Sequence, residues 1–147
     1  MSVPADPSAS SNPRTRAREL VDGRRARILV VEDDEASRYG MHALLESEGY
    51  AVETAGSLGE AEESLARAEA DVILLDVTLP DGDGAAWLQR RASRSDATPP
   101  VLALTGVTDT RRIRDSGVER ILTKPVNVTQ LLLVLKETLD RPACGVK

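Results

Sequence analysis

Apolar residues along the chain fall in short runs that are separated by longer stretches of mixed polarity. Short runs rich in Val, Ile and Leu predict β-strands, and continuous runs predict strands that are covered on both faces. The strands are expected at 27–31, 50–55, 71–76, 100–106 and 118–125. The intervening stretches predict helices, which are expected at 35–49, 57–70, 85–93, 109–117 and 127–140.

Signals at the helix ends support this division. Gly49 stands where the first helix should stop. Ser57 is followed three residues later by Glu60, which is the capping-box pattern, and Asn127 is an N-cap candidate for the last helix. Five strand–helix units in strict alternation indicate an α/β domain, a doubly wound parallel sheet with helices on both faces.

Composition and charge narrow the class of protein. The 147 residues suit one domain, and with 2% aromatic residues and no Phe its core must be aliphatic. The net charge is −5, although the first 27 residues carry six arginines against three acidic residues, and this distribution is not typical of a nucleic-acid binder. One cysteine, Cys144, and one histidine, His42, exclude an internal disulfide and a Cys or His zinc cluster. With no apolar run long enough to cross a membrane and no signal peptide, we expect a cytoplasmic location.

Polar residues stand where four of the predicted strands end, and in a parallel sheet these ends share one edge, where ligands bind. They are Glu32, Asp33 and Asp34 after the first strand, Asp76 ending the third, Thr105 ending the fourth, and Lys124 before Pro125 ending the fifth. Clustered carboxylates repel unless a cation neutralises them, and oxygen ligands suit Mg²⁺. The pattern therefore predicts a Mg²⁺-dependent site for a phosphoryl group with an aspartate as nucleophile.

The motifs at these strand ends are "ILVVEDD", "LLDVTLPDGDG", "LALTG" and "ILTKP". Together, in this order, they make residues 26–141 resemble a response-regulator receiver domain of two-component signalling. The resemblance implies the flavodoxin-like (βα)5 fold, with a five-stranded parallel sheet in strand order 2-1-3-4-5. The remaining residues are expected to form a disordered arm, 1–25, rich in Pro, Ser and Arg, and a flexible tail, 142–147.

Matched position by position, the resemblance also implies roles. Asp76 is the phosphoacceptor, and Thr105 supplies a hydroxyl that moves onto the phosphoryl group. Lys124 pairs with the phosphoryl oxygens, and the peptide that joins it to Pro125 is cis. The implied Mg²⁺ ligands are Glu32, Asp33, Asp76 and the backbone carbonyl of Thr78. Asp34 lies just past the acidic pair and is expected outside the metal's ligands, because one of these acids also suits a helix cap.

The other two acids of the Asp76 motif have a structural interpretation. Asp81 and Asp83 favour turn geometry, and Gly82 and Gly84 allow positive φ there. A histidine kinase or histidine phosphotransfer protein is the implied donor, and the domain would promote its own phosphorylation and dephosphorylation rather than act as an enzyme.

Output is expected through an unidentified protein partner, because the residues after 141 are too few for a DNA-binding domain. A homodimer that forms on phosphorylation stays open. So does the choice between a free-standing regulator and a piece of a hybrid kinase.

Three features depart from the family pattern. Ile121 replaces the aromatic residue that moves with the threonine, and Val126 replaces another common aromatic. The spacing from Thr105 to Lys124 is nearly one helical turn shorter than is usual in the family, which predicts a short fourth helix. These departures keep open a receiver-like binding module that works without phosphorylation.

Two further classes fit the site less well. An aspartyl-phosphate phosphatase of the haloacid-dehalogenase type carries a second Asp two residues after the nucleophile, where this chain has Thr78. A flavin carrier of the same fold needs a Ser, Thr and Gly-rich phosphate loop and aromatic residues to enclose the ring, and this chain has "EDDEAS" instead.

Overall fold

The structure is a computed structural model that describes residues 20–21, 24–79, 82–92, 99–106, 111–114 and 117–140. Its centre is a five-stranded sheet in the order β4-β3-β5-β8-β9, in which every neighbouring pair is parallel. The strands are β3 (Arg27–Val31), β4 (Ala51–Ala55), β5 (Val72–Asp76), β8 (Val101–Thr105) and β9 (Arg120–Thr123). Counted along the chain this order is 2-1-3-4-5, so the predicted topology is confirmed.

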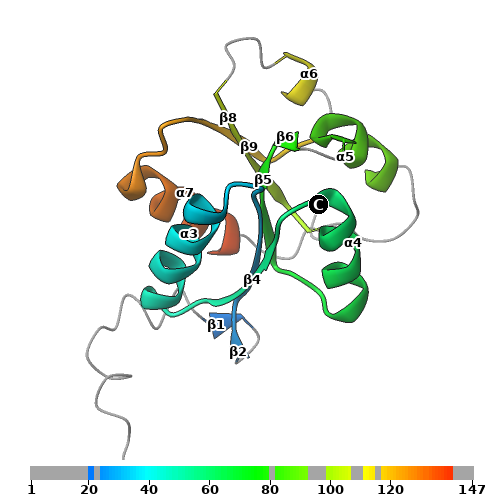
Figure 1. Cartoon of the computed structure of the whole chain (residues 1–147). Helices are drawn as coiled ribbons and strands as arrows, with labels where there is room; N and C mark the ends of the chain where they lie inside the picture. The colour runs from blue at the N-terminus through cyan, green and yellow to red at the C-terminus, as the bar shows by residue number, and fades with distance from the viewer. Residues whose placement is uncertain are drawn as a thin grey trace, which may run out of the picture.

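Helices cover both faces of this sheet, as predicted (Figure 1). The covering helices are α3 (Glu35–Ser47), α4 (Leu58–Arg67), α5 (Gly84–Ala92) and α7 (Val128–Asp140), and the short α6 (Arg111–Arg114) follows β8. Helices α3 and α7 pack on one face through Leu45 and Leu131, and α4 and α5 pack on the other through Leu58 and Leu88. The fourth helix of the alternation, α6, spans four residues in the part of the chain that the structure describes, in agreement with the prediction that it is short.

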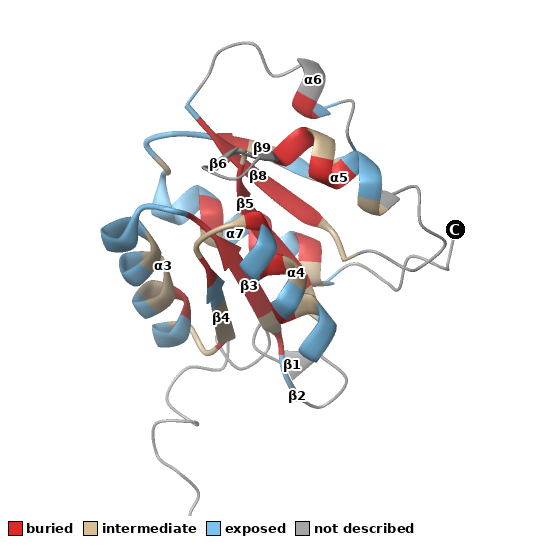
Figure 2. Cartoon of the chain, turned by 45° about the vertical axis from the view of Figure 1, so that its right-hand side comes forward, coloured by how far each residue is buried: buried red, intermediate tan, exposed pale blue. Residues whose placement is uncertain are grey.

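The strand sequences explain the two cores. Successive side chains of a strand point to opposite faces, so Ile28 and Val30 of β3 enter one cluster while Leu29 and Val31 enter the other. All four are at most 1% exposed, and the buried residues run along the sheet between the helical layers (Figure 2). Burying one such side chain contributes roughly 1.5–3 kcal/mol relative to exposure, so a continuous apolar strand stabilises both layers at once.

Local capping fixes where three of the helices begin. The Asp34 carboxylate accepts from the backbone N–H of Ser37 at 2.8 Å and caps α3. Ser57 Oγ accepts from the N–H of Glu60 at 3.2 Å, which confirms the predicted cap of α4. Asn127 Oδ1 accepts from the N–H of residue 130 at 2.9 Å, which confirms the cap of α7.

The segment after β5 turns back in a short antiparallel pair, β6 (Thr78–Leu79) with β7 (Gly82–Asp83). The expectation that Gly84 serves through positive φ is wrong, because positive φ is found at Gly49 and Gly117 instead. Gly84 is needed for space: a Cβ there would lie 3.0 Å from the Cα of Val77. Helix α5 can therefore start directly against the backbone that follows Asp76. Asp81 lies outside the described residues.

A hydrogen bond and an ion pair connect α5 to α4. Trp87 is 2% exposed and its indole N–H donates to Glu62 of α4 at 2.7 Å. Arg91 pairs with the same carboxylate at 3.1 Å and lies over the Trp87 ring, 5.5 Å from its centroid. Trp87 packs in the same core cluster as Leu29 and Ile73 of the sheet, and its contact with Glu62 holds the helix that follows the β6–β7 turn.

The N-terminal segment contributes a small pair that the sequence did not predict. Strand β1 (Leu20–Val21) pairs antiparallel with β2 (Arg24–Arg25). The Arg25 guanidinium donates to the carbonyl oxygens of Gly49 and Tyr50, at 2.9 and 2.7 Å. Most of the arm expected at 1–25, and the tail expected at 142–147, lie outside the described residues.

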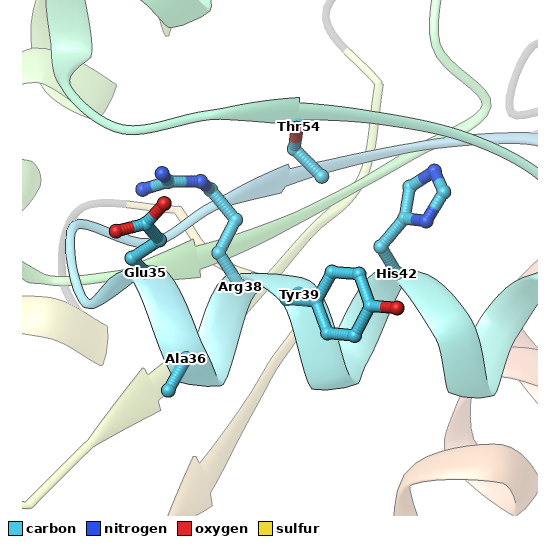
Figure 3. Close-up of a pocket in the computed structure, with 6 residues that line it drawn as sticks. All are labelled: Glu35, Ala36, Arg38, Tyr39, His42 and Thr54. Atoms are coloured by element: carbon cyan, nitrogen blue, oxygen red, sulfur yellow. The ribbon is translucent and has the colours of Figure 1, made fainter.

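An open pocket of about 590 Å³ lies between the outer side of α3 and the edge strand β4 (Figure 3). Its lining residues are Glu35, Ala36, Arg38, Tyr39, His42 and Thr54. In the part of the chain that the structure describes, no helix combines the length and the apolar composition that crossing a bilayer demands.

Candidate functional site

Three carboxylates meet where β3 and β5 end. Asp76 is the last residue of β5 and is 4% exposed, and Glu32, the first residue after β3, is 6% exposed. Asp33 follows Glu32 and is exposed to solvent. One carboxylate oxygen from each of the three residues lies within 4.8 Å of the others. Since β3 and β5 are neighbours in the sheet, their register brings these acids together, as the strand-end rule predicts.

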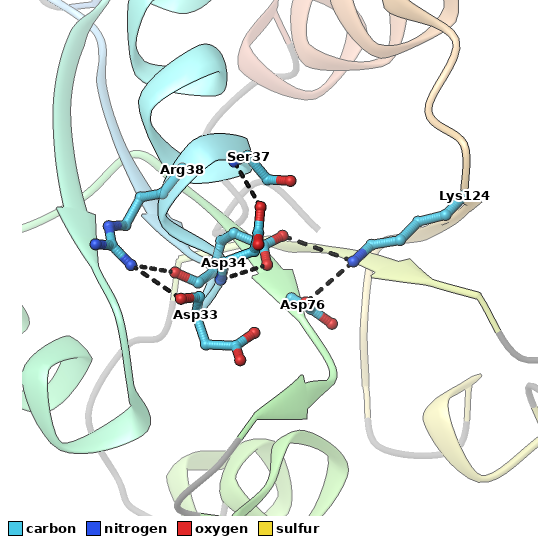
Figure 4. Close-up of polar contacts among 7 residues, drawn as sticks. Asp33, Asp34, Ser37, Arg38, Asp76 and Lys124 are labelled. Atoms are coloured by element: carbon cyan, nitrogen blue, oxygen red, sulfur yellow. Dashed lines mark hydrogen bonds and ion pairs between the residues drawn. The ribbon is translucent and has the colours of Figure 1, made fainter.

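Lys124 reaches the same cluster from the end of β9 (Figure 4). Its Nζ lies 3.0 Å from Asp76 Oδ2 and 3.6 Å from Glu32 Oε1. Its backbone N–H donates to the Thr105 carbonyl at 2.8 Å, so β8 and β9 stay paired up to the site. The peptide between Lys124 and Pro125 is cis, in agreement with the resemblance. A lysine held in this way presents positive charge to both buried carboxylates.

Thr105 occupies the corresponding end of β8. It is 1% exposed, and it follows Leu104, whose Cα is the register partner of Asp76. Thr78 begins β6 two residues after Asp76, and the part played by its carbonyl stays a prediction. Strand pairing thus places Thr105 on β8, the strand next to that of Asp76, one residue beyond the residue that pairs with Asp76.

Burial and mutual charge shape the ionisation of the cluster. Burial raises the pKa of Glu32 above its usual 4.5, and the charge of Asp76 acts in the same direction, against the backbone N–H of Asp34 and Lys124. Partial burial acts to lower the pKa of Lys124, but its hydrogen bond to Asp76 and the charges of Asp76 and Glu32 outweigh it, so the pKa is raised. The lysine therefore stays protonated beside an anionic site.

Asp34 and Arg38 shape the loop that carries the acidic pair. Asp34 points to the start of α3. The pKa of its carboxyl is lowered, chiefly by the hydrogen bond that it accepts from the Ser37 N–H. Asp34 is not one of the three carboxylates that lie together, and its place outside the metal's ligands stays a prediction. Arg38 was missed by the sequence analysis. It donates to the carbonyl oxygens of Glu32 and Asp33, and the only available signal was a cation one turn inside the helix that follows the acidic pair.

The donor set suits a hard divalent cation. Three carboxylate oxygens close together, two from buried side chains and one from an exposed side chain, fit Mg²⁺, which takes one or two carboxylates and keeps several waters. They suit a soft metal less well, because neither sulfur nor imidazole takes part in the group.

Comparison with known proteins gives the family of the chain. Residues 28–136 match the family model of the response regulator receiver domain. The chain is 37% identical over 118 residues to the transcriptional regulatory protein PmrA of Pectobacterium parmentieri, a match that covers 78% of this chain and 53% of the relative. It is 32% identical over 118 residues to the virulence transcriptional regulatory protein PhoP of Salmonella typhimurium, with 78% and 52% covered.

A solved structure agrees with these sequence matches. The CheY-like receiver domain protein of Methanospirillum hungatei superposes with a TM-score of 0.72 at 31% identity, covering 78% of this chain and 94% of that one. The chain belongs to the response-regulator receiver domain family, and its fold is flavodoxin-like. It is a receiver domain of two-component signalling, consistent with a phosphoacceptor role. It spans about half the length of the curated relatives it matches.

Proposed function

We propose that Asp76 accepts a phosphoryl group from a phosphohistidine, with Mg²⁺ held by Glu32, Asp33, Asp76 and the carbonyl of Thr78. A carboxylate oxygen of Asp76 forms a bond to phosphorus while the N–P bond of the phosphohistidine breaks, which gives an acyl phosphate and a free histidine. The observation that carries this proposal is the position of the Asp76 carboxylate, which is buried at a strand end, within 4.8 Å of two other carboxylates and 3.0 Å from Lys124.

Electrostatic stabilisation and positioning account for most of phosphoryl transfer. Bound Mg²⁺ would neutralise charge on the phosphoryl oxygens. Lys124, already paired with Asp76, would move its contact to one of these oxygens once the carboxylate is phosphorylated. Thr105 would donate its hydroxyl to another. By the same reasoning the domain promotes hydrolysis of the acyl phosphate, because the groups that stabilise transfer to Asp76 also stabilise transfer from it to water.

Phosphorylation is expected to act on the β8–α6–β9 region. Thr105 and Lys124 are joined by a backbone hydrogen bond of 2.8 Å, so a shift of either moves the adjoining ends of both strands. The donor would be a histidine kinase or a histidine phosphotransfer protein, and a further protein would receive the signal. Residues 26–141 would form this receiver unit, with 1–25 as an arm and 142–147 as a tail. A homodimer that forms on phosphorylation is a further proposal.

The test is intact mass after incubation with acetyl phosphate and Mg²⁺. The expected result is one added phosphoryl group, which does not form when EDTA is present or in Asp76→Asn. It should still form in the matched control Asp140→Asn, since Asp140 is an exposed aspartate at the end of α7. Decay of the adduct after removal of the donor gives the rate of self-dephosphorylation. Binding of beryllofluoride separates failure to react from rapid hydrolysis.

A second candidate is a receiver-like module that binds its partner without phosphorylation. It is favoured by Ile121 in place of the usual aromatic residue and by the four residues of α6. No adduct together with no beryllofluoride binding would support this second candidate over the first.

A further inference from the structure

Arg38 contacts the acidic loop from outside the carboxylate cluster. It lies one turn into α3, and its Nη1 donates to the carbonyl oxygen of Glu32 at 2.9 Å and to that of Asp33 at 3.4 Å (Figure 4). Glu32 and Asp33 are the two residues that offer carboxylates on the β3 side of the site. One guanidinium nitrogen thus bridges the backbone of both.

This double contact defines the shape of the loop. In an extended strand, adjacent carbonyls point to opposite sides, so two adjacent carbonyls can share one donor only where the chain has turned. The turn comes at once after the sheet, since the Glu32 N–H still donates to Ala55 of β4 at 2.9 Å. The Glu32 carboxylate accepts from the Asp34 N–H at 3.0 Å, inside the same turn. Arg38 therefore holds the backbone from which both carboxylates project.

The Arg38 guanidinium lies against Gly56, the residue after β4. A Cβ on Gly56 would stand 2.9 Å from Arg38 Nη1, closer than two such atoms approach. Gly56 has no positive φ, so its backbone accepts a side chain, and the crowding falls mainly on the far end of the arginine, with Glu60 Oε1 next at 3.4 Å. Elsewhere the Arg38 side chain lines the open pocket beside α3, which leaves it room to move (Figure 3).

We propose that Arg38 is a positioning residue for the metal site, which orients Glu32 and Asp33 through their carbonyls and needs the absence of a side chain at Gly56 to do so. The inference rests on the proposed function, because it concerns the affinity of that site for Mg²⁺. Groups that orient metal ligands from behind matter: their loss typically weakens binding by roughly 10- to 100-fold.

The charge of Arg38 and its two carbonyl contacts have opposite effects on the affinity of the site for Mg²⁺. A cation near the carboxylates repels Mg²⁺, so removal of the charge alone would tighten binding. Loss of the two carbonyl contacts would weaken it. The direction of the change therefore distinguishes the two effects, and Gly56→Ala isolates the geometric one because it displaces the guanidinium and keeps the charge.

The experiment is Mg²⁺ titration by calorimetry on the full chain, alongside thermal unfolding without metal. The variants are Arg38→Ala, Arg38→Lys, Gly56→Ala and the double variant of Arg38→Ala with Gly56→Ala. Arg67→Ala is the matched control, since Arg67 is an exposed arginine on α4 that pairs with Glu53. The rate of phosphoryl uptake is also measured at saturating Mg²⁺.

We expect Arg38→Ala to raise the Kd for Mg²⁺ about tenfold, Gly56→Ala to raise it several-fold, and Arg38→Lys to fall between wild type and Arg38→Ala. The double variant should equal Arg38→Ala in its Kd for Mg²⁺, because among the neighbours of Gly56 it is the arginine that contacts the acidic loop. Uptake at saturating Mg²⁺ should stay within about twofold of wild type. A residue with a merely structural role would lower the unfolding temperature and leave the Kd unchanged.

Equal Kd values in wild type, Arg38→Ala and Gly56→Ala would overturn the proposal, as would an effect of Gly56→Ala that persists in the Arg38→Ala background. If Arg38→Ala does not fold, Gly56→Ala alone decides between these outcomes. Wild-type protein that binds no Mg²⁺ would overturn the metal site itself and the inference with it, whereas wild-type binding with unchanged variants overturns only the role of Arg38.

Discussion

Two halves of the sheet supply the site in different ways. The β3–α3–β4–α4 half brings Glu32 and Asp33, and its two helices have 13 and 10 residues with a capping side chain at each start. The β8–α6–β9 half brings Thr105 and Lys124, and its helix has four residues. Within the described part of that helix, Ile113 is the buried side chain, at 7% exposure.

The difference shows what holds each part of the site. On the first half, the acidic loop is fixed by side chains, through the Asp34 cap and the Arg38 contacts. On the second, Thr105 and Lys124 are placed by strand pairing, through a backbone bond between them and the β8–β9 register. A metal site needs rigid ligands, and a switch needs a region that can move at little cost. The first half therefore fits the metal binding proposed above, and the second fits the proposed signalling.

The largest expected effect comes from Lys124→Ala. It should slow phosphoryl uptake by about 100-fold, as removal of a preorganised donor to a transition-state oxygen typically does. It should leave the Kd for Mg²⁺ unchanged or lower, because a nearby cation is lost. The measurement is uptake from acetyl phosphate by intact mass, paired with calorimetry.

Arg120→Ala, at the exposed start of β9, is the control for Lys124→Ala and should behave as wild type. Asp33→Ala should show the reverse pattern, with weak metal binding as the main defect. If Lys124→Ala and Asp33→Ala weaken Mg²⁺ binding equally, the two halves do not divide the roles as proposed.

A second comparison uses stability. Leu45 of α3 is fully buried in a long helix, and Leu45→Ala should cost about 3 kcal/mol in the free energy of unfolding. Ile113→Ala should cost less, about 2 kcal/mol, because a short helix can shift to fill the space. Urea unfolding measures both. Equal losses would mean that the β8–α6–β9 half is packed as firmly as the first.

The smallest effect concerns pH and Glu32. Burial, with the charge of Asp76, raises the pKa of Glu32 above 4.5, so the folded state binds this proton more tightly than the unfolded chain. The stability that the protonated group contributes is therefore complete below pH 4.5 and is lost as pH rises through the folded-state pKa. In EDTA, the free energy of unfolding of wild type relative to Glu32→Gln should fall over that range.

The contrast with metal-bound protein tests the same point. Mg²⁺ requires the ionised carboxylate, so added Mg²⁺ should stabilise wild type more as pH rises, and Glu32→Gln should show less of this gain. Urea unfolding of both proteins with and without Mg²⁺ measures the difference. A pH profile in EDTA that is the same for both proteins would contradict the raised pKa.

The helices and strands were predictable because their signals are local. Continuous apolar runs marked the strands. Ser57 and Asn127 marked two helix starts, because each caps an N–H that lies three residues further along the chain. The edge of the sheet that carries the acids followed from strand alternation alone. The role of Gly84 was missed, because the close approach of Val77 depends on how α5 packs and leaves no local pattern.

The sequence by itself determined the order of the elements, the doubly wound class and the residues at the strand ends. This was possible because strand and helix periodicity and the helix caps depend on residues that are close together in the sequence. Only the tertiary structure decided which side chains support the loops and helices. Arg38 supports the acidic loop, Arg25 binds the segment at the end of α3, and Glu62 joins Trp87 and Arg91. The reason is physical, because long polar side chains reach partners that are distant in sequence, and their choice among these partners is settled by packing and burial.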